Sequence, residues 1–365
     1  MKIECMKEKL GETIASAARF SGKHPTLPVL SAFLCEAKQN TLLIRATNLD
    51  IGIEITIPVK VFTEGSVAIP AQIITQTISA IQGKQVLWEE KDGNILLSSG
   101  SYKTIVKCVP KDDFPTIPAI IEGDEVEIQA KKFAEGIEAV VYSASVSEIK
   151  PELSSVYIYP EQNMLVFVST DSFRLAEKKI PIKGIKDFPG IIIPYKNAIE
   201  IARVCSTTPD SLRIVFNKHH ISFSSNSFHI TSRLIEGTFP DYKQIIPKEE
   251  KTRVVALKQD FVQAVKATAV FANKFNQLSI KVKPEDTLFS INSKNSDIGE
   301  ISVSLDAAIS GDSVEMNVNT RYFSDCLAHI HQDSVALLFN GPGRPIIISG
   351  ASDMLFTYLV MPMNK

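Results

Sequence analysis

The sequence predicts an α+β protein built from three repeated domains, each with two helices and antiparallel sheets. Three observations predict this class. An amphipathic helical stripe recurs three times along the 365 residues, a Leu-Ser pair opens a strand-rich stretch after each stripe, and a second helical stripe follows each polar turn. Recurrence at a fixed spacing is typical of repeat architectures. We therefore expect domains at residues 1–122, 127–247 and 253–365.

The first helix of each repeat is indicated by mostly apolar residues at offsets 0, 4, 7 and 8, which form one stripe of a helix. The stripes begin at Leu10, Phe133 and Phe261, so successive starts are 123 and 128 residues apart. Their members are Leu10, Ile14, Ala17 and Ala18, then Phe133, Ile137, Val140 and Val141, then Phe261, Val265, Thr268 and Ala269.

The strands follow each first helix. A Leu-Ser pair leads through an alternating or β-branched run into a polar turn, as in antiparallel strands joined by tight turns. The pairs and their turns are Leu30-Ser31 with Thr47-Asn48, Leu153-Ser154 with Thr170-Asp171, and Leu278-Ser279 with Lys294-Asn295. The pairs are 123 and 125 residues apart, so the register of the repeat is kept.

The second helix of each repeat has apolar residues at offsets 0, 4 and 7. The residues are Ile74, Ile78 and Ile81, then Ala198, Ala202 and Cys205, then Phe323, Leu327 and Ile330. Pro70 and Pro194 precede the first two of these helices, a position where proline is tolerated. Residues 118–126 and 247–252 are the expected linkers.

Composition limits the class of protein. With 44% hydrophobic and 22% charged residues the chain can bury a sizeable core. The 39 Lys and Arg against 41 Asp and Glu give a net charge of -2, which excludes a protein that holds nucleic acid by overall charge. No apolar run approaches the roughly 18 residues of a membrane span, and the first residues lack an apolar signal region. We expect a cytoplasmic protein that does not enter membranes.

No chemistry that needs a cofactor or metal is indicated. The five cysteines are spread along the chain without a CxxC pair, so we expect reduced thiols. His219 and His220 are neighbours on a strand and point to opposite faces, and His329 and His331 do not share a helix face. A nucleophile-base constellation and a phosphate-binding loop are both missing, so we expect no catalytic residues.

Four strings carry a resemblance to a known family. His24 to Leu30 reads HPTLPVL, Ser169 to Ala176 reads STDSFRLA, Glu236 to Tyr242 reads EGTFPDY, and Leu359 to Met363 reads LVMPM. In this order and on a threefold repeat, they make the chain resemble the bacterial beta sliding clamp, the DNA polymerase III beta subunit, over essentially its whole length.

The resemblance implies the DNA clamp fold and a head-to-tail homodimer whose six domains close into a ring around duplex DNA. It implies a non-catalytic processivity factor that docks the replicative polymerase, the clamp loader, DNA-repair polymerases and mismatch-repair or ligase proteins through short linear peptides. A ring holds DNA by topology without regard to its sequence, which fits a net charge of -2. The alternative is a multidomain protein that binds DNA directly, or a nucleic-acid enzyme whose residues converge from distant segments.

The resemblance also assigns residues to three surfaces. The DNA-facing candidates are Lys23, His24, Lys150, Lys196 and Arg203. The dimer candidates are Val270 and Phe271 as an apolar centre, with the strand around Glu300 pairing with the strand of Lys103 and Lys107. The peptide-cleft candidates are Leu153, Thr170, Ser172, Phe173, Arg174, Leu175, Pro240, Ile245, Pro345, Leu359, Val360, Met361, Pro362 and Met363.

The chain departs from the family pattern at the cleft. Ser172-Phe173 replaces Gly-His, and Gln244 stands where an arginine is common. One wall of the cleft is therefore expected to be more apolar and to favour a somewhat different peptide. For Leu359 and Val360 the alternative is that they belong only to the last core strand.

Overall fold

The structure is a computed structural model that describes residues 1–22, 27–120, 122–247 and 249–363. It comprises two compact units. The first consists of Met1–Ala134 and Ile199–Glu236, and the second of Glu135–Ala198 and Gly237–Lys365. The division falls within helices α3 (Ala130–Glu138) and α4 (Tyr195–Ser206).

The first unit contains helices α1 (Lys7–Ala17) and α2 (Ala71–Ala80) and two antiparallel sheets. Its strands are β1 (Lys2–Met6), β2 (Ala32–Lys38), β3 (Thr41–Thr47), β4 (Ile51–Pro58), β5 (Lys60–Thr63), β6 (Gly65–Pro70), β7 (Gln85–Lys91), β8 (Asn94–Ser99), β9 (Tyr102–Lys107), β10 (Asp124–Gln129), β15 (Ser211–Phe216), β16 (His220–Ser224) and β17 (Phe228–Arg233). The sheet orders are β5-β1-β7-β8-β9 and β10-β15-β16-β17-β4-β3-β2-β6.

The second unit contains helices α5 (Lys258–Val270) and α6 (Thr320–Leu327) and two further antiparallel sheets. Its strands are β11 (Ser155–Glu161), β12 (Met164–Thr170), β13 (Arg174–Pro181), β14 (Ile191–Pro194), β18 (Thr252–Leu257), β19 (Gln277–Lys283), β20 (Leu288–Asn295), β21 (Gly299–Leu305), β22 (Ala307–Gly311), β23 (Val314–Asn319), β24 (Ser334–Phe339), β25 (Ile346–Gly350) and β26 (Phe356–Val360). The sheet orders are β14-β11-β12-β13-β26-β25-β24-β18-β22 and β21-β20-β19-β23.

Successive repeats are joined by strand pairing. The last strand of the second repeat, β17, pairs with β4 of the first, with Ile230 opposite Ile53. In the same way β26 of the third repeat pairs with β13 of the second, with Leu175 opposite Leu359. Each junction is therefore one continuous sheet. The equivalent strands at the two ends of the repeat series, β9 and β21, are edge strands of their sheets.

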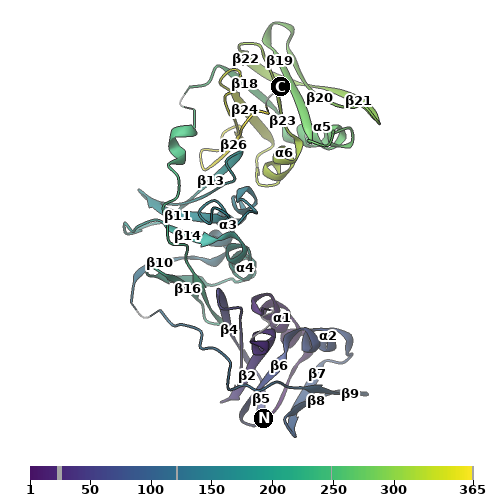
Figure 1. Ribbon diagram of the computed structural model, residues 1–365, viewed down its shortest axis with the longest axis vertical. Helices are drawn as coiled ribbons and strands as arrows, with labels where there is room; N and C mark the ends of the chain where they lie inside the picture. The colour runs from purple at the N-terminus through teal and green to yellow at the C-terminus, as the bar shows by residue number, and fades with distance from the viewer. Residues whose placement is uncertain (23–26, 121, 248, 364–365) are drawn as a thin grey trace. The chain divides into compact units, whose positions relative to one another are not determined.

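The predicted helical stripes are confirmed as buried helix faces except near their C-terminal ends, where Ala269 is exposed and Ala18, Ile81, Val140, Val141 and Ile330 lie beyond the helices. Leu10 and Ile14 of α1 and Phe261 of α5 have no exposed surface. Figure 1 shows α1 beside α2, and α5 beside α6, and each pair is in contact. The polar turns are confirmed as well, because each one joins two paired strands, β3 to β4, β12 to β13 and β20 to β21.

Several element boundaries differ from the prediction. Helix α3 ends at Glu138, because the amide of Val140 bonds to the carbonyl of Ile137, and this three-residue spacing tightens the chain into a short 3-10 turn at Val141–Ser143. Leu30-Ser31 closes another 3-10 turn, and β2 begins only at Ala32. The first linker is shorter than expected, since β10 begins at Asp124.

Candidate functional site

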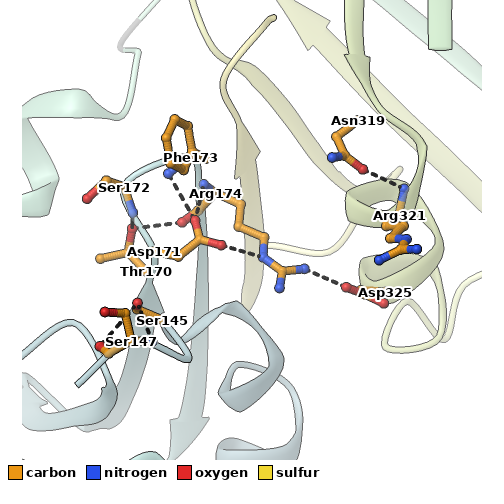
Figure 2. Close-up of polar contacts among 10 residues, drawn as sticks. All are labelled: Ser145, Ser147, Thr170, Asp171, Ser172, Phe173, Arg174, Asn319, Arg321 and Asp325. Carbon is orange, nitrogen blue, oxygen red and sulfur yellow. Dashed lines mark hydrogen bonds and ion pairs between the residues drawn. The ribbon is translucent and has the colours of Figure 1, made fainter. Parts of the chain in front are cut away.

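The turn between β12 and β13 is shaped by one carboxylate. Asp171 Oδ1 accepts hydrogen bonds from the amides of Phe173 and Arg174, both at 2.9 Å, as in an Asx turn. The hydroxyl of Thr170 donates to the carbonyl of Arg174 at 2.7 Å. Ser172 adopts a left-handed φ of 75°, a conformation that favours glycine. The turn thereby projects Phe173 outward, with 62% of its surface exposed (Figure 2).

Arg174 points the other way, into a cage of acidic and aromatic side chains. Its Nε donates to Asp171 Oδ2 at 3.0 Å, and its Nη1 donates to Asp325 Oδ2 of α6 at 2.5 Å (Figure 2). The guanidinium carbon lies 4.6 Å from the ring centroid of Tyr322. Only 13% of the arginine side chain is exposed. Arg174 therefore ties the second repeat to the third.

The position of Asp325 follows from the start of α6. The side chain of Asn319 accepts a hydrogen bond from the amide of Arg321 at 3.0 Å and caps the helix (Figure 2). Five residues after the first residue of α6, Asp325 lies on the side that meets Arg174. Asp325 was not among the predicted site residues, and 151 residues separate it from Arg174.

After β26 ends at Val360, the chain runs along the same turn. The amide of Met361 donates to the carbonyl of Phe173 at 2.8 Å, and the amide of Met363 donates to the carbonyl of Asn317 at 2.7 Å. Met361, Pro362 and Met363 are half-buried. By contrast, Leu175, Leu359 and Val360 have 0 to 1% exposed surface and lie in the paired core strands.

A pocket of about 560 Å³ opens beside this strand. It brings together three of the predicted cleft residues, Ile245, Pro345 and Met361. Its other lining residues are Gln244, Ile246, Pro247, Glu249, Lys251, Asn340, Gly343 and Arg344. Among the remaining predictions, Pro240 is exposed, Leu153 is half-buried, and Thr170 is buried within the turn.

The wall that carries Ile245 is anchored by a buried polar network. The hydroxyl of Tyr242 donates to Glu177 of β13 and lies 2.7 Å from the hydroxyl of Tyr159. Glu177 is only 6% exposed. Burial, and next the charge of Glu177, raises the pKa of Tyr242, so the phenol keeps its proton and acts as donor. Neither the sequence motifs nor the helical periodicity indicated Glu177.

Two of the predicted DNA-facing cations, Lys196 and Arg203, are paired with acids. Lys196 Nζ lies 2.6 Å from Glu148 Oε1, and Arg203 Nη1 lies 2.7 Å from Glu200 Oε1. A hydrogen bond from Lys196 lowers the pKa of Glu148. Lys150 is exposed. Lys23 and His24 lie outside the described residues.

The predicted dimer residues are spread over two edges. Lys103 and Lys107 are exposed on edge strand β9 of the first unit. In the second unit Glu300 lies on edge strand β21 and pairs with Lys294 at 3.1 Å. Val270 at the end of α5 is 67% exposed. The ring of Phe271 lies next to Gly299, the first residue of β21. Its Cε1 is 3.7 Å from the position that a side-chain Cβ would take at Gly299.

Two negative findings concern the described residues alone. No group of three or more His, Cys, Asp or Glu side chains in this part of the chain is arranged to hold a metal ion. No helix in the described ranges has the length and apolar character that a membrane crossing requires.

Comparison with protein families gives matches along the chain. The models of the N-terminal, central and C-terminal domains of the DNA polymerase III beta subunit match residues 1–118, 127–241 and 243–364. The chain is 26% identical over 349 residues to proteins named beta sliding clamp from Staphylococcus aureus and Staphylococcus epidermidis, covering 93% of each chain.

Solved structures share the fold. The DNA polymerase III beta subunit of Thermotoga maritima matches with a TM-score of 0.93 and 24% identity, covering 100% of this chain and 99% of that one. The DNA polymerase sliding clamp of Bacillus subtilis gives the same values. A sliding clamp of Pseudomonas aeruginosa bound to griselimycin matches with a TM-score of 0.94 and 22% identity, with both chains fully covered.

Proposed function

Because this chain belongs to the DNA polymerase III beta subunit family, we propose that it is a DNA sliding clamp, a ring of two copies that encircles duplex DNA and gives the replicative polymerase its processivity. It catalyses no reaction and needs no cofactor. Its domains are residues 1–122, 127–247 and 253–365, and it works in the cytoplasm. Its partners are the polymerase, the clamp loader, and repair and ligase proteins.

The pattern of strand junctions supports the ring. Strands β4, β13 and β21 occupy equivalent places in the three repeats, and so do β9, β17 and β26. Strand β4 pairs with β17, and β13 pairs with β26, which leaves β21 and β9 as edges. An exposed edge strand is a template for pairing with another chain. By the same pattern, β21 of one copy therefore pairs with β9 of a second copy.

This contact is head-to-tail, and a head-to-tail contact forms a ring when the rotation closes. Two copies with three repeats each provide six repeats and two such contacts. Glu300 on β21 then faces the cations Lys103 and Lys107 on β9, and Val270 with Phe271 supplies the apolar centre beside β21. The exposed ion pairs add little stability, so the apolar contact and the strand pairing hold the ring.

Topology replaces tight binding to phosphate in this arrangement. A cation that grips phosphates strongly would slow sliding, whereas a cation shared with a neighbouring carboxylate attracts DNA weakly. The pairing of Lys196 with Glu148 and of Arg203 with Glu200 fits this requirement. Lys150 and, by resemblance, Lys23 and His24 complete the DNA-facing set.

The partner site is the pocket at the end of the last strand. Ile245, Pro345 and Met361 line it, and exposed Phe173 adds apolar surface nearby, on the turn that binds Met361. The other residues of the proposed cleft, Leu153, Thr170, Ser172, Arg174, Leu175, Pro240, Leu359, Val360, Pro362 and Met363, shape or support its walls. Methionine is flexible and polarizable, so one groove can accept several different peptides.

Retention on DNA tests the ring directly. The protein is loaded by a clamp loader onto a nicked circular plasmid and separated from free protein by gel filtration, before and after the plasmid is cut once. A ring stays on the circle and leaves the linear form through its ends. Equal retention on both forms, with a steep dependence on salt, would identify a protein that binds DNA directly.

A further inference from the structure

The lining of the pocket beside Met361 includes two cations. Lys251, at the entry to β18, and Arg344, just before β25, both line it, and both side chains are exposed. Glu249 is the one carboxylate among the lining residues, so the lining carries a net charge of about +1 at neutral pH. The apolar lining residues Ile245 and Pro345 belong to the same pocket.

These two cations differ from most of the functional cations described above. Lys196, Arg203 and Arg174 each have a carboxylate within 3.0 Å. Within the ranges that the structure describes, the side chains of Lys251 and Arg344 form no ion pair and no hydrogen bond. Two cations without an ion-pair partner in the lining of a pocket favour a ligand that brings its own negative charge.

The backbone holds both cations in place. The amide of Lys251 donates to the carbonyl of Phe339 at 3.0 Å, next to the paired strands β18 and β24. Arg344 ends a turn in which Gly341 and Gly343 have φ angles of 99° and 70°, values that favour glycine. The amide of Arg344 closes this turn on the carbonyl of Gly341 at 3.3 Å.

A third lining residue also lacks a partner. The side-chain nitrogen of Asn340 is buried and has no hydrogen-bond partner among the described residues. A buried amide without a partner is unfavourable. When the Asn340 side chain rotates toward the pocket, its amide nitrogen can donate to an acceptor oxygen of a bound segment. A carboxylate offers such oxygens.

We propose that the partner segment bound in this pocket carries acidic residues next to its apolar anchors, and that Lys251 and Arg344 select for them. This inference rests on the proposed function, because it assumes that the pocket is a peptide site. The apolar residues Ile245, Pro345 and Met361 hold the anchors. Arg344 suits a carboxylate because its planar guanidinium can form two parallel hydrogen bonds, while Lys251 acts as a point charge.

Two labelled peptides test the selection by fluorescence anisotropy. Both carry the same two adjacent leucines as anchors, and the residues before the anchors are two aspartates in one peptide and two asparagines in the other. At about 50 mM salt we expect the acidic peptide to bind the wild-type protein roughly two- to tenfold more tightly, since each exposed charge pair contributes modestly. The preference should shrink at about 500 mM salt because the Debye length shortens.

Substitutions in the pocket test which residues cause the preference for the acidic peptide. Arg344→Gln and Lys251→Gln should each reduce the preference for the acidic peptide and leave the affinity for the asparagine peptide nearly unchanged. Lys183→Gln, at an exposed lysine outside the pocket lining, removes the same charge and should keep the preference.

The outcomes separate this inference from the proposed function. If the wild-type protein binds both peptides equally well, the proposed selection for acidic residues is wrong, while the proposed peptide site stands. A preference that survives both pocket substitutions would also overturn it. If neither peptide binds at any salt concentration, the peptide site itself fails, and the inference fails with it.

Discussion

At the scale of single residues, Arg174 shows how one charge can join a turn to a helix that is distant in the sequence. Its guanidinium is shared between Asp171 of its own turn and Asp325 of α6. A poorly exposed charge is tolerated only when it is paired and hydrogen-bonded. The same turn projects Phe173 and accepts a hydrogen bond from the amide of Met361, so the ion pairs of Arg174 link α6 to the turn that contacts the end of the chain.

We predict that Asp171→Asn destabilises the protein more than Asp325→Asn. The first change weakens two backbone hydrogen bonds and one ion pair, with an expected cost of about 2 kcal/mol. The second removes one ion pair whose carboxylate is 41% exposed, with an expected cost of about 1 kcal/mol. Thermal unfolding followed by circular dichroism would measure both, with Asp286→Asn at an exposed pair as control. Equal effects of the two changes would contradict this account of the turn.

We further predict that Glu148→Gln strengthens contact with DNA. The change frees Lys196 from its carboxylate, and one additional phosphate contact should steepen the salt dependence of DNA affinity by about one unit of log-log slope. Binding to duplex DNA titrated at several salt concentrations would measure this slope.

The matched control for this prediction is Glu125→Gln. Glu125 pairs with Arg213 at 2.8 Å across the neighbouring strands β10 and β15, and neither residue is among the predicted DNA-facing cations. The Glu125→Gln change should leave the salt dependence of DNA affinity unchanged. A Glu148 variant that behaves like the Glu125 variant would show that Lys196 does not face DNA.

At the scale of elements, the sequence predicts the helices and turns that depend on local hydrophobic periodicity. The helical stripes and polar turns are local signals, and the buried faces of α1 and α5 follow from them. The ends of helices depend on single hydrogen bonds, so the end of α3 could not be predicted. Glu177 of strand β13, Asp325 of helix α6 and Arg344 of a turn reach their places near the end of the chain only through folding. Local spacing carries no signal for such residues.

The segment after α6 is predicted to be sensitive to acid. The ring of His329 stacks on Tyr142 with centroids 4.9 Å apart. Burial, and next the neighbouring His331, lowers the pKa of His329 from its ordinary value near 6.5, although Asp325 opposes the shift. The unfolded chain then takes up a proton below about pH 6.5 that the folded protein does not. The folded state should therefore lose stability as the pH falls below that value.

Thermal midpoints at pH 7.5 and pH 5.5 would measure this loss. His329→Phe keeps an aromatic ring against Tyr142 but cannot be protonated, so its midpoint should fall less between the two pH values than the midpoint of the wild-type protein. His219→Phe, at a site where 56% of the side chain is exposed, is the control. An identical fall in wild type and His329→Phe would assign the acid sensitivity to other groups.

At the scale of the whole molecule, the repeat determines the assembly. Each internal junction is formed by one strand from each of two successive repeats, and the series leaves one unpaired strand of each kind, β9 and β21. All five cysteines are free thiols, four of them buried and Cys108 half-buried. Burial raises the pKa of Cys5 to about 12, so the thiol stays protonated and unreactive at neutral pH.

The double change Val270→Ala with Phe271→Ala is predicted to shift the protein from dimer to monomer. Burial of such side chains contributes roughly 1.5 to 3 kcal/mol each, and a closed ring loses this contribution at both of its contacts. Because Val270 is 67% exposed within one copy, the fold itself should change little. Sedimentation velocity at micromolar concentration would measure the change in mass, and the circular dichroism spectrum would confirm folding. Met354→Ala removes an apolar side chain that is 90% exposed elsewhere and should leave the dimer intact. A dimer that survives the double change would place the contact away from α5 and would remove the apolar centre from the proposed ring.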